Sequence, residues 1–151
     1  MRSANHLNSY RKIATLTAPP GQIVLMLYEG AIRALERALP GFTIDDPAEA
    51  NMTVHNNLQK AQEIIRELNY ALNMEQGGEC AITLRQLYEY FDRRLWESNL
   101  QKKPDGVTEV ILHLSEIRNA WATMLANQIT PDPEAVLPTS MPRGEAAYAA
   151  A

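Results

Sequence analysis

Apolar residues recur at helical spacing in four stretches of the chain, and no stretch shows the sustained alternation that is typical of a strand. The first stretch, residues 20–39, is apolar around most of its circumference. Its polar side chains share one arc of roughly 100° on a helical wheel, and Met26 falls inside that arc. They are Gln22, Glu29, Arg33, Glu36 and Arg37. Such a helix must be covered on most sides, either at the centre of a bundle or by a partner in a groove.

The second stretch carries the clearest boundary signals. Asp46 is placed to cap a helix that begins at Pro47, with Glu49 as its partner in a capping box. We expect Gly77 and Gly78 to end this helix. Its apolar residues alternate in steps of four and three, which is typical of a face that packs against neighbouring helices. They are Val54, Leu58, Ala61, Ile65, Leu68 and Leu72.

The third and fourth stretches complete the pattern. We expect the third helix to end near Lys102 and Lys103, because Pro104 prevents its continuation, and Asp105 to cap the fourth. The predicted core faces hold Leu84, Leu87, Tyr88, Phe91 and Leu95 in the third helix, and Val107, Val110, Ile111, Leu114, Trp121 and Leu125 in the fourth.

The sequence therefore predicts an all-α fold, an antiparallel four-helix bundle over residues 20–129. We expect an N-terminal arm over residues 1–19, with a short extra helix as one option. A disordered tail rich in proline and alanine is expected over residues 130–151. In the arm, Tyr10, Ile13 and Leu16 recur every three residues. This spacing suits a short helix that docks on the bundle or a removable cover over a groove.

Composition narrows the class of protein. The net charge is −4, and the basic residues form no continuous stripe, so nucleic acid is not an expected partner. No run approaches the roughly 20 apolar residues that a membrane-spanning helix needs, and the first residues do not resemble a secretory signal. Cys80 is the only cysteine, which excludes an intrachain disulfide. These features favour a soluble cytoplasmic protein without membrane insertion.

The sequence contains no recognisable motif for catalysis, phosphate binding or metal binding, so we expect no enzyme, no cofactor and no metal. His113 lies between Glu109 and Glu116 but off the apolar stripe, and is interpreted as a surface histidine. His55 leaves open a histidine phosphotransfer bundle, although the residues that follow it differ from those usual at such sites. A purely structural dimeric bundle is a further alternative.

Some apolar residues belong to no predicted core face. On the third helix, Ile82, Trp96 and Leu100 project away from it. Each alone is common on a protein surface, but together with the first helix they suggest a surface that could hold a partner's helix. Arg118 falls in the middle of the fourth helix's apolar stripe. Either its stem packs on the bundle with the guanidinium in water, or it pairs with a carboxylate of the bundle or of a bound chain.

Several blocks of the chain, in order, resemble the flagellin-specific chaperone family of flagellar export, FliS. One of these blocks is Leu27-Tyr28-Glu29-Gly30-Ala31-Ile32, which is similar to a signature of the family. The other blocks are Tyr10, Thr17-Ala18-Pro19-Pro20, and residues 60–68, 84–90 and 114–121. The resemblance implies a cytoplasmic chaperone that binds the C-terminal helical segment of flagellin and prevents its premature polymerisation. It also implies delivery of flagellin to the flagellar type III export apparatus, without a cofactor.

Carried onto this chain, the resemblance makes the arm residues Tyr10, Ile13 and Leu16 a candidate gate over an apolar cleft. It places the cleft on the second to fourth helices, so we expect the first helix to be the central and most covered one. The candidate lining residues are Ile64, Leu68, Leu87, Tyr88, Trp96, Leu112 and Arg118.

Overall fold

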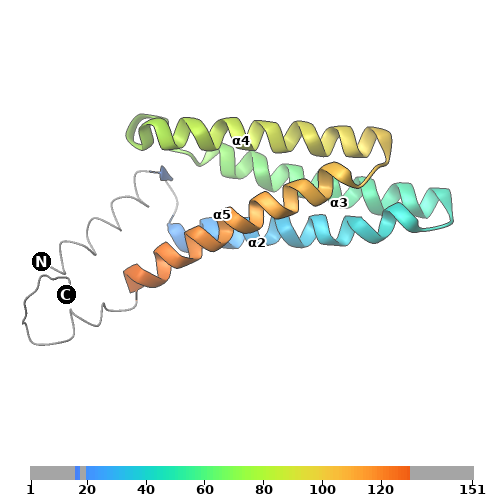
Figure 1. Cartoon of the computed structure of the whole chain (residues 1–151), viewed down its shortest axis with the longest axis horizontal. Helices are drawn as coiled ribbons and strands as arrows, with labels where there is room; N and C mark the ends of the chain where they lie inside the picture. Colours follow the sequence, from blue (N-terminus) through green and yellow to red (C-terminus); the bar gives the residue numbers. More distant parts are fainter. Residues whose placement is uncertain (1–15, 18–19, 130–151) are drawn as a thin grey trace, which may run out of the picture.

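Four long helices account for most of the part of the chain that the computed structural model describes, residues 16–17 and 20–129 (Figure 1). Consecutive helices run in opposite directions, which confirms the predicted all-α bundle. A 3₁₀ turn, η1, follows the first helix at Leu39–Thr43. The long helices are α2 (Gly21–Ala38), α3 (Pro47–Tyr70), α4 (Met74–Gln101) and α5 (Asp105–Ile129).

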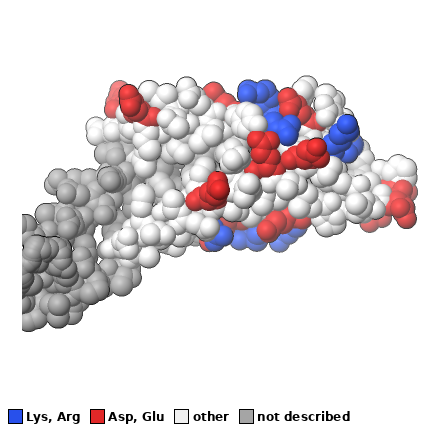
Figure 2. All heavy atoms as spheres, viewed as in Figure 1, with Lys and Arg blue, Asp and Glu red and all other residues white. Residues whose placement is uncertain are grey.

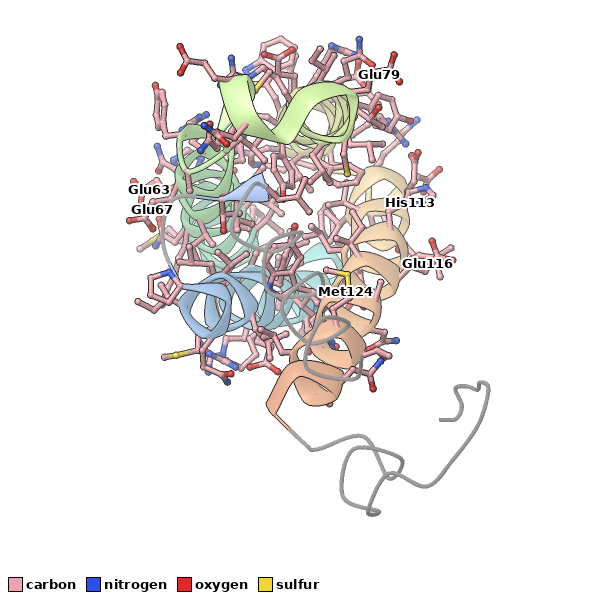
Figure 3. The ribbon with its side chains drawn as sticks, turned by 90° about the vertical axis from the view of Figure 1, so that its left-hand side faces the viewer. Glu63, Glu67, Glu79, His113, Glu116 and Met124 are labelled. Atoms are coloured by element: carbon pink, nitrogen blue, oxygen red, sulfur yellow. The ribbon has the colours of Figure 1, made fainter. Side chains whose placement is uncertain are left out.

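The helices are arranged as the corners of a square. Helix α2 packs mainly on α3 and α5, and α4 packs mainly on the same two helices. Seen along the bundle, α4 and α2 therefore lie on opposite corners (Figure 3). The outer faces of these two helices point to opposite sides of the molecule.

The core matches the predicted apolar faces most closely on α3. All six residues predicted from its heptad-like spacing are buried: five lie on α3, and the sixth, Leu72, lies just after its end. On α4, Leu84 and Leu87 are only partly buried against the core, whereas Tyr88, Phe91 and Leu95 are fully buried. The hydrophobic effect of this shared interior holds the four amphipathic helices together.

Local signals set the start of α3 as predicted. The Asp46 side chain accepts a hydrogen bond from the Glu49 amide at 2.9 Å, and Pro47 is the first helical residue. Helix α4 ends at Gln101, where Lys102 adopts a left-handed conformation with a φ of 53°. Asp105 lies inside the first turn of α5 instead of before it. There its carboxylate still complements the positive end of the helix dipole.

The predicted end of the second helix at Gly77 and Gly78 is wrong. Helix α3 ends at Tyr70, and α4 begins three residues before Gly77, where the Asn73 side chain accepts from the Gln76 amide at 3.0 Å. Gly78 instead forms a kink inside α4 with φ 58° and ψ −137°, a conformation that favours glycine. A tertiary contact explains the earlier end of α3: Leu72 is buried, and the Asn73 amide donates to the Leu16 carbonyl at 3.0 Å.

Candidate partner-binding surfaces

The outer face of α2 is less covered than the sequence suggests. The Ile23 side chain is 48% exposed and that of Met26 is 60% exposed. The expectation that the first helix is the most covered of the four is therefore wrong for these two residues. They lie three positions apart and so share one side of the helix. Helices α3 and α5 cover the opposite side, where Val24, Tyr28 and Leu35 are buried.

We call the contact zone between two neighbouring helices a seam. The seam between α2 and α3 is apolar. Within the described residues, the side-chain hydrogen bonds and ion pairs of α2 run to α4 and α5, and none reaches α3. Even Gly30 does not require an unusually close approach here, because a Cβ at this position would make only an ordinary contact, 3.5 Å from the Ile64 Cδ1. Shape alone, without polar bridges, sets the register along this seam.

Arg118 lies in the seam between α2 and α5. Its Nη1 is 3.7 Å from the Glu29 Oε2, while its Nε is buried without a hydrogen-bond partner among the described residues. Arg118 therefore faces a carboxylate of the bundle, as the second interpretation of this residue expected. The distance is longer than that of a hydrogen bond. A second link closes the same seam near one end, where the Trp121 Nε1 donates to the Gly21 carbonyl at 2.9 Å.

The seam between α3 and α4 is bridged by a ladder of polar side chains. Three α3 residues spaced by seven, His55, Gln62 and Asn69, each face an α4 residue. The Gln62 Nε2 donates to the Asp92 Oδ1 at 3.0 Å, and Arg66 donates to the same oxygen at 3.2 Å. The outer rungs join His55 to Asn99 at 3.0 Å and Asn69 to Arg85 at 3.2 Å. The Asn99, Asp92 and Arg85 partners are also spaced by seven, so this ladder, here called the polar ladder, fixes the antiparallel register.

Charged groups also bridge α4 to α5. The Arg94 Nε donates to the Glu109 Oε1 at 2.8 Å, and the Tyr90 hydroxyl donates to the Glu109 Oε2 at 2.5 Å. The hydrogen bonds from Tyr90 and Arg94 lower the pKa of the Glu109 carboxyl. Both seams of α4 are therefore held by directional polar contacts, unlike the seam between α2 and α3.

Two tyrosines connect the opposite corners of the bundle. The hydroxyls of Tyr28 on α2 and Tyr88 on α4 share a hydrogen bond in the core, where both rings are buried. Burial raises the pKa of Tyr28 to about 12, and burial also raises the pKa of Tyr88. Each hydroxyl satisfies the other, which allows two polar groups to occupy an apolar interior.

The residues predicted to line a cleft lie on several different faces of the bundle. Leu68 and Tyr88 are in the core, where a partner would reach them only after a rearrangement. Ile64 and Leu87 are partly buried, and Arg118 lies in the seam described above. Trp96 and Leu112 are exposed on α4 and α5. The predicted lining thus does not form one continuous cleft.

The sequence interpretation did not assign Ile23, Met26, Met52 and Tyr70 to the site, although the structure exposes all four. Because it exposes large apolar residues on each of the four helices, the apolar surface is distributed around the bundle. On the face that Figure 2 shows, acidic and basic side chains are interspersed, and the basic ones form no continuous stripe.

The N-terminal arm is described only at its last residues. Leu16 is partly buried against the core, and its carbonyl accepts from Asn73. Thr17 is buried and forms an antiparallel bridge with Leu72. The arm is therefore attached to the connection between α3 and α4. Tyr10 and Ile13, the other candidate gate residues, lie outside the described residues.

The two histidines in the described part of the chain, His55 and His113, belong to no recognisable reactive constellation. Figure 3 shows His113 and Glu116 on the outer side of α5; the His113 ring stacks on Phe91 with ring centroids 6.0 Å apart. Its nitrogens lie 4.0 Å from Glu109 and 3.5 Å from Glu116. In the described part of the chain, no three acidic, histidine or cysteine side chains gather as metal ligands would. None of the described helices combines the length and apolar character that crossing a bilayer requires.

Comparisons with known proteins match the sequence of this chain to one family. The family model described as flagellar protein FliS matches residues 3–128. The flagellar secretion chaperone FliS of Salmonella typhimurium (strain LT2) is 35% identical over 126 residues, covering 80% of this chain and 90% of the relative. The protein of that name from Bacillus subtilis (strain 168) is 31% identical over 128 residues, covering 85% of this chain and 92% of the relative. That from Escherichia coli (strain K12) is 32% identical over 139 residues, covering 88% and 99%. The chain belongs to the FliS family of flagellar secretion chaperones.

Proposed function

We propose that this protein is a cytoplasmic export chaperone that binds the C-terminal helical segment of flagellin. Binding prevents flagellin from polymerising early and supports its delivery to the flagellar type III export apparatus. One observation carries the proposal: a bundle of this family exposes large apolar side chains on all four helices. Such a distribution suits a partner that wraps around the bundle better than one that fills a single pocket.

The physical requirement on the surface follows from the state of the cargo. A segment that is disordered alone must lose conformational entropy when it binds, and buried apolar area must offset that loss. Many shallow contacts meet this requirement while still permitting release at export. The proposal needs no catalytic step, nucleotide or cofactor.

Within this proposal, α2 is the helix best suited to adapt to the cargo. Ile23 and Met26 are exposed on it, and its seam with α3 lacks polar bridges. Arg118 is the candidate polar contact beside it, because its Nε has no partner among the described residues. A carbonyl or carboxylate of the cargo would satisfy that group if the α2–α5 seam opened.

Co-purification from cells tests the central claim. Tagged full-length protein should recover full-length flagellin in a roughly one-to-one complex and should not recover flagellin that lacks its C-terminal helical region. Equal recovery of the two forms of flagellin would contradict the proposed binding mode.

A pair of surface variants then tests the role of α2. Ile23→Asp combined with Met26→Asp should weaken flagellin binding at least about tenfold, which corresponds to about 1.4 kcal/mol, without unfolding the bundle. The matched control is Gln59→Asp, an exposed polar position on α3. If the control and the α2 variant bind alike, α2 is not part of the site.

Two N-terminal deletions separate the candidate gate residues, Tyr10 and Ile13, from the residues that attach the arm to the bundle, Leu16 and Thr17. Removal of residues 1–13 takes away Tyr10 and Ile13 but leaves the contacts of Leu16 and Thr17 with the α3–α4 connection. Removal of residues 1–17 takes away the candidate gate residues and also the contacts of Leu16 and Thr17. A gate at Tyr10 and Ile13 requires the first deletion to change flagellin affinity while thermal stability stays constant. Identical affinity and stability for the shorter deletion would leave the arm without such a role.

A histidine phosphotransfer function makes a different prediction. His55→Ala would then abolish phosphate uptake from a phosphorylated response regulator, whereas a flagellin chaperone should bind its cargo unchanged. In the structure, the His55 Nδ1 is engaged by Asn99 in the polar ladder, so this histidine already has a structural partner.

A further inference from the structure

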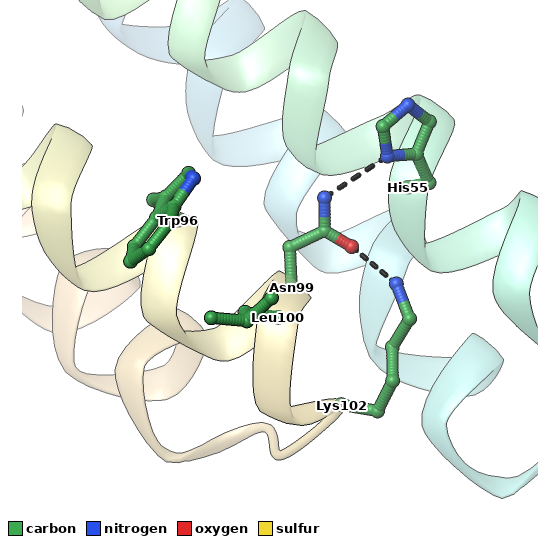
Figure 4. Close-up of a pocket in the computed structure, with 5 residues that line it drawn as sticks. All are labelled: His55, Trp96, Asn99, Leu100 and Lys102. Atoms are coloured by element: carbon green, nitrogen blue, oxygen red, sulfur yellow. Dashed lines mark hydrogen bonds between the residues drawn. The ribbon is translucent and has the colours of Figure 1, made fainter.

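A surface hollow of about 320 Å³ lies beside the C-terminal end of α4 (Figure 4). It is lined by His55 from α3 and by Trp96, Asn99, Leu100 and Lys102 from the end of α4. Trp96 is 58% exposed and Leu100, one turn later, is 67% exposed. Tryptophan is enriched among the residues that contribute most to protein binding, and Trp96 here lies beside a second exposed apolar side chain. We call this place the α4 hollow.

A chain of polar contacts holds a positive charge at the edge of the α4 hollow. The Asn99 amide nitrogen bonds the His55 Nδ1 at 3.0 Å, and the Asn99 Oδ1 accepts a hydrogen bond from the Lys102 ammonium (Figure 4). The left-handed conformation of Lys102 turns the chain at this point. Partial burial lowers the pKa of the Lys102 ammonium. The lysine is therefore positioned before any partner arrives.

No carboxylate neutralises this charge among the described residues. The ion pairs there involve Arg66, Arg94, Arg118 and His113, and none includes Lys102, Lys103 or Arg93. Arg93 lies three residues before Trp96, and Lys103 follows Lys102; both are exposed. The Arg93 guanidinium lies over the Tyr90 ring, 5.6 Å from its centroid, so Lys102 is the cation that lines the hollow beside the exposed apolar side chains.

A second hollow, on the outer face of α3, provides a contrast. Its lining includes Lys60 and Arg66, but also Glu63 and Glu67, which lie together on that face (Figure 3). Arg66 also pairs with Asp92. The positive charges there are balanced by neighbouring carboxylates, so this hollow does not select for an acidic partner.

We propose that the α4 hollow binds an acidic amphipathic segment of a protein partner other than flagellin. An apolar side chain of the segment contacts Trp96 and Leu100, and a carboxylate next to it pairs with the Lys102 ammonium. Charge complementarity of this kind favours the correct partner and speeds association. The inference does not rest on flagellin binding.

Asp132 and Glu134, the first two acidic residues after α5, are too close to its end to reach this hollow from the same molecule. Helix α5 ends at Ile129, at the opposite end of the bundle from the α4 hollow (Figure 1). Its 25 residues span roughly 37 Å. Asp132 and Glu134 follow Ile129 by only three and five positions, and five extended residues reach about 18 Å at most. Glu145 follows Ile129 by 16 positions, so an extended chain of about 55 Å is long enough to reach the hollow.

Synthetic peptides test the proposal on the full-length protein. One series of short helical peptides carries leucines at varied helical spacings between glutamates. A second series replaces each glutamate by lysine, and a third replaces each leucine by alanine. The readout is the indole N–H resonance of Trp96, assigned by comparison with Trp96→Phe. The buried Trp121 indole, which is held by Gly21, serves as an internal reference.

The acidic leucine peptides should shift the Trp96 resonance and bind at least about tenfold more tightly than the lysine or alanine series. Lys102→Glu should weaken that binding at least about tenfold, and added salt should weaken it further. The matched control, Lys60→Glu in the α3 hollow, should change it less than about twofold.

Several outcomes would overturn the proposal. Absence of binding in every series, equal binding of acidic and basic peptides, or equal effects of the two lysine variants would each do so. If bound flagellin blocks the peptides, the α4 hollow belongs to the cargo surface. If deletion of the residues after Ile129 changes the Trp96 resonance before peptide is added, the occupant is the C-terminal tail of this chain, from the same or from a neighbouring molecule.

Discussion

Helices α2 and α4 occupy opposite corners of the bundle and pack on the same two neighbours, but different kinds of contact hold them there. Helix α4 is joined to α3 by the polar ladder and to α5 through Glu109. Helix α2 has no side-chain polar link to α3 within the described residues and only two to α5, of which one is a long ion pair. Directional contacts fix one register, whereas apolar packing tolerates small shifts. We therefore expect α4 to be the rigid side of the molecule and α2 the adaptable one.

The largest expected difference in the free energy of unfolding is between two glycine variants, one in the α4–α5 seam and one in the α2–α3 seam. A Cβ at Gly106, where α5 packs on α4, would lie 2.7 Å from the Arg94 backbone oxygen. Gly106→Ala should therefore lower the free energy of unfolding by about 3 kcal/mol. Gly30→Ala on α2 meets only an ordinary contact with Ile64 and should raise it by up to about 1 kcal/mol through helix propensity. Urea denaturation of both variants measures the difference. Similar losses for both would show that the two sides are equally tight.

Two carboxylates offer the next test. Asp92→Ala removes the carboxylate that accepts from both Gln62 and Arg66, and leaves the buried Gln62 amide only the longer contact, 3.3 Å, to the backbone carbonyl of residue 92. We expect a loss of about 2 kcal/mol in the free energy of unfolding. Glu29→Ala removes only the long contact to Arg118 and should cost less than about 0.5 kcal/mol. A larger cost for Glu29→Ala than for Asp92→Ala would reverse the assignment of the rigid side.

The Tyr28–Tyr88 pair links α2 to α4, and the pH dependence of stability tests that link. Because burial raises the pKa of Tyr28 to about 12, the native state keeps its proton between pH 10 and 12 while the unfolded state loses it. The stabilisation is complete below pH 10 and is lost as the pH rises, by about 1.4 kcal/mol at pH 11 for this residue. The double variant Tyr28→Phe/Tyr88→Phe should lack this decline when chemical denaturation is compared at pH 9 and pH 11. Equal declines would show that the pair does not stay protonated in the native state.

The smallest expected effect is at Arg118. Arg118→Met keeps the apolar stem and removes a buried Nε that has no partner, so the free energy of unfolding should change by less than about 0.5 kcal/mol. The matched variant Arg94→Met removes close contacts to Glu97 and Glu109 and should cost about 1 kcal/mol. Thermal denaturation compares the two. If flagellin affinity falls for Arg118→Met at constant stability, this arginine acts in binding.

Local chemistry explains why much of the fold was predictable. The Asp46–Pro47–Glu49 signal acts within one helical turn, and the spacing from Val54 to Leu72 encodes which face of α3 is buried. The Gly77–Gly78 boundary was wrong because a tertiary contact decides it. Leu72 packs in the core and Asn73 pairs with Leu16, far away in sequence, so α3 ends earlier than the glycines indicate.

The candidate site was less predictable, because it depends on how the helices are arranged. The wheel correctly placed Ile82, Trp96 and Leu100 outside the core. It placed Met26 in the polar arc of α2, but it could not show which sides of that helix the neighbouring helices cover, so the exposure of Ile23 was missed. The polar ladder did leave a signal, since its members recur at intervals of seven on both helices. Their pairing, however, requires the register between α3 and α4.

The single hydrogen bond from the Asn73 amide to the Leu16 carbonyl has a practical consequence. Its donor is in the helical bundle and its acceptor is in the arm, so this amide becomes open to exchange with deuterium whenever the arm detaches, even while the helices stay folded. The protection factor of one backbone N–H therefore reports the free energy of arm docking. Following that amide before and after flagellin is added would test whether the proposed cargo displaces the arm.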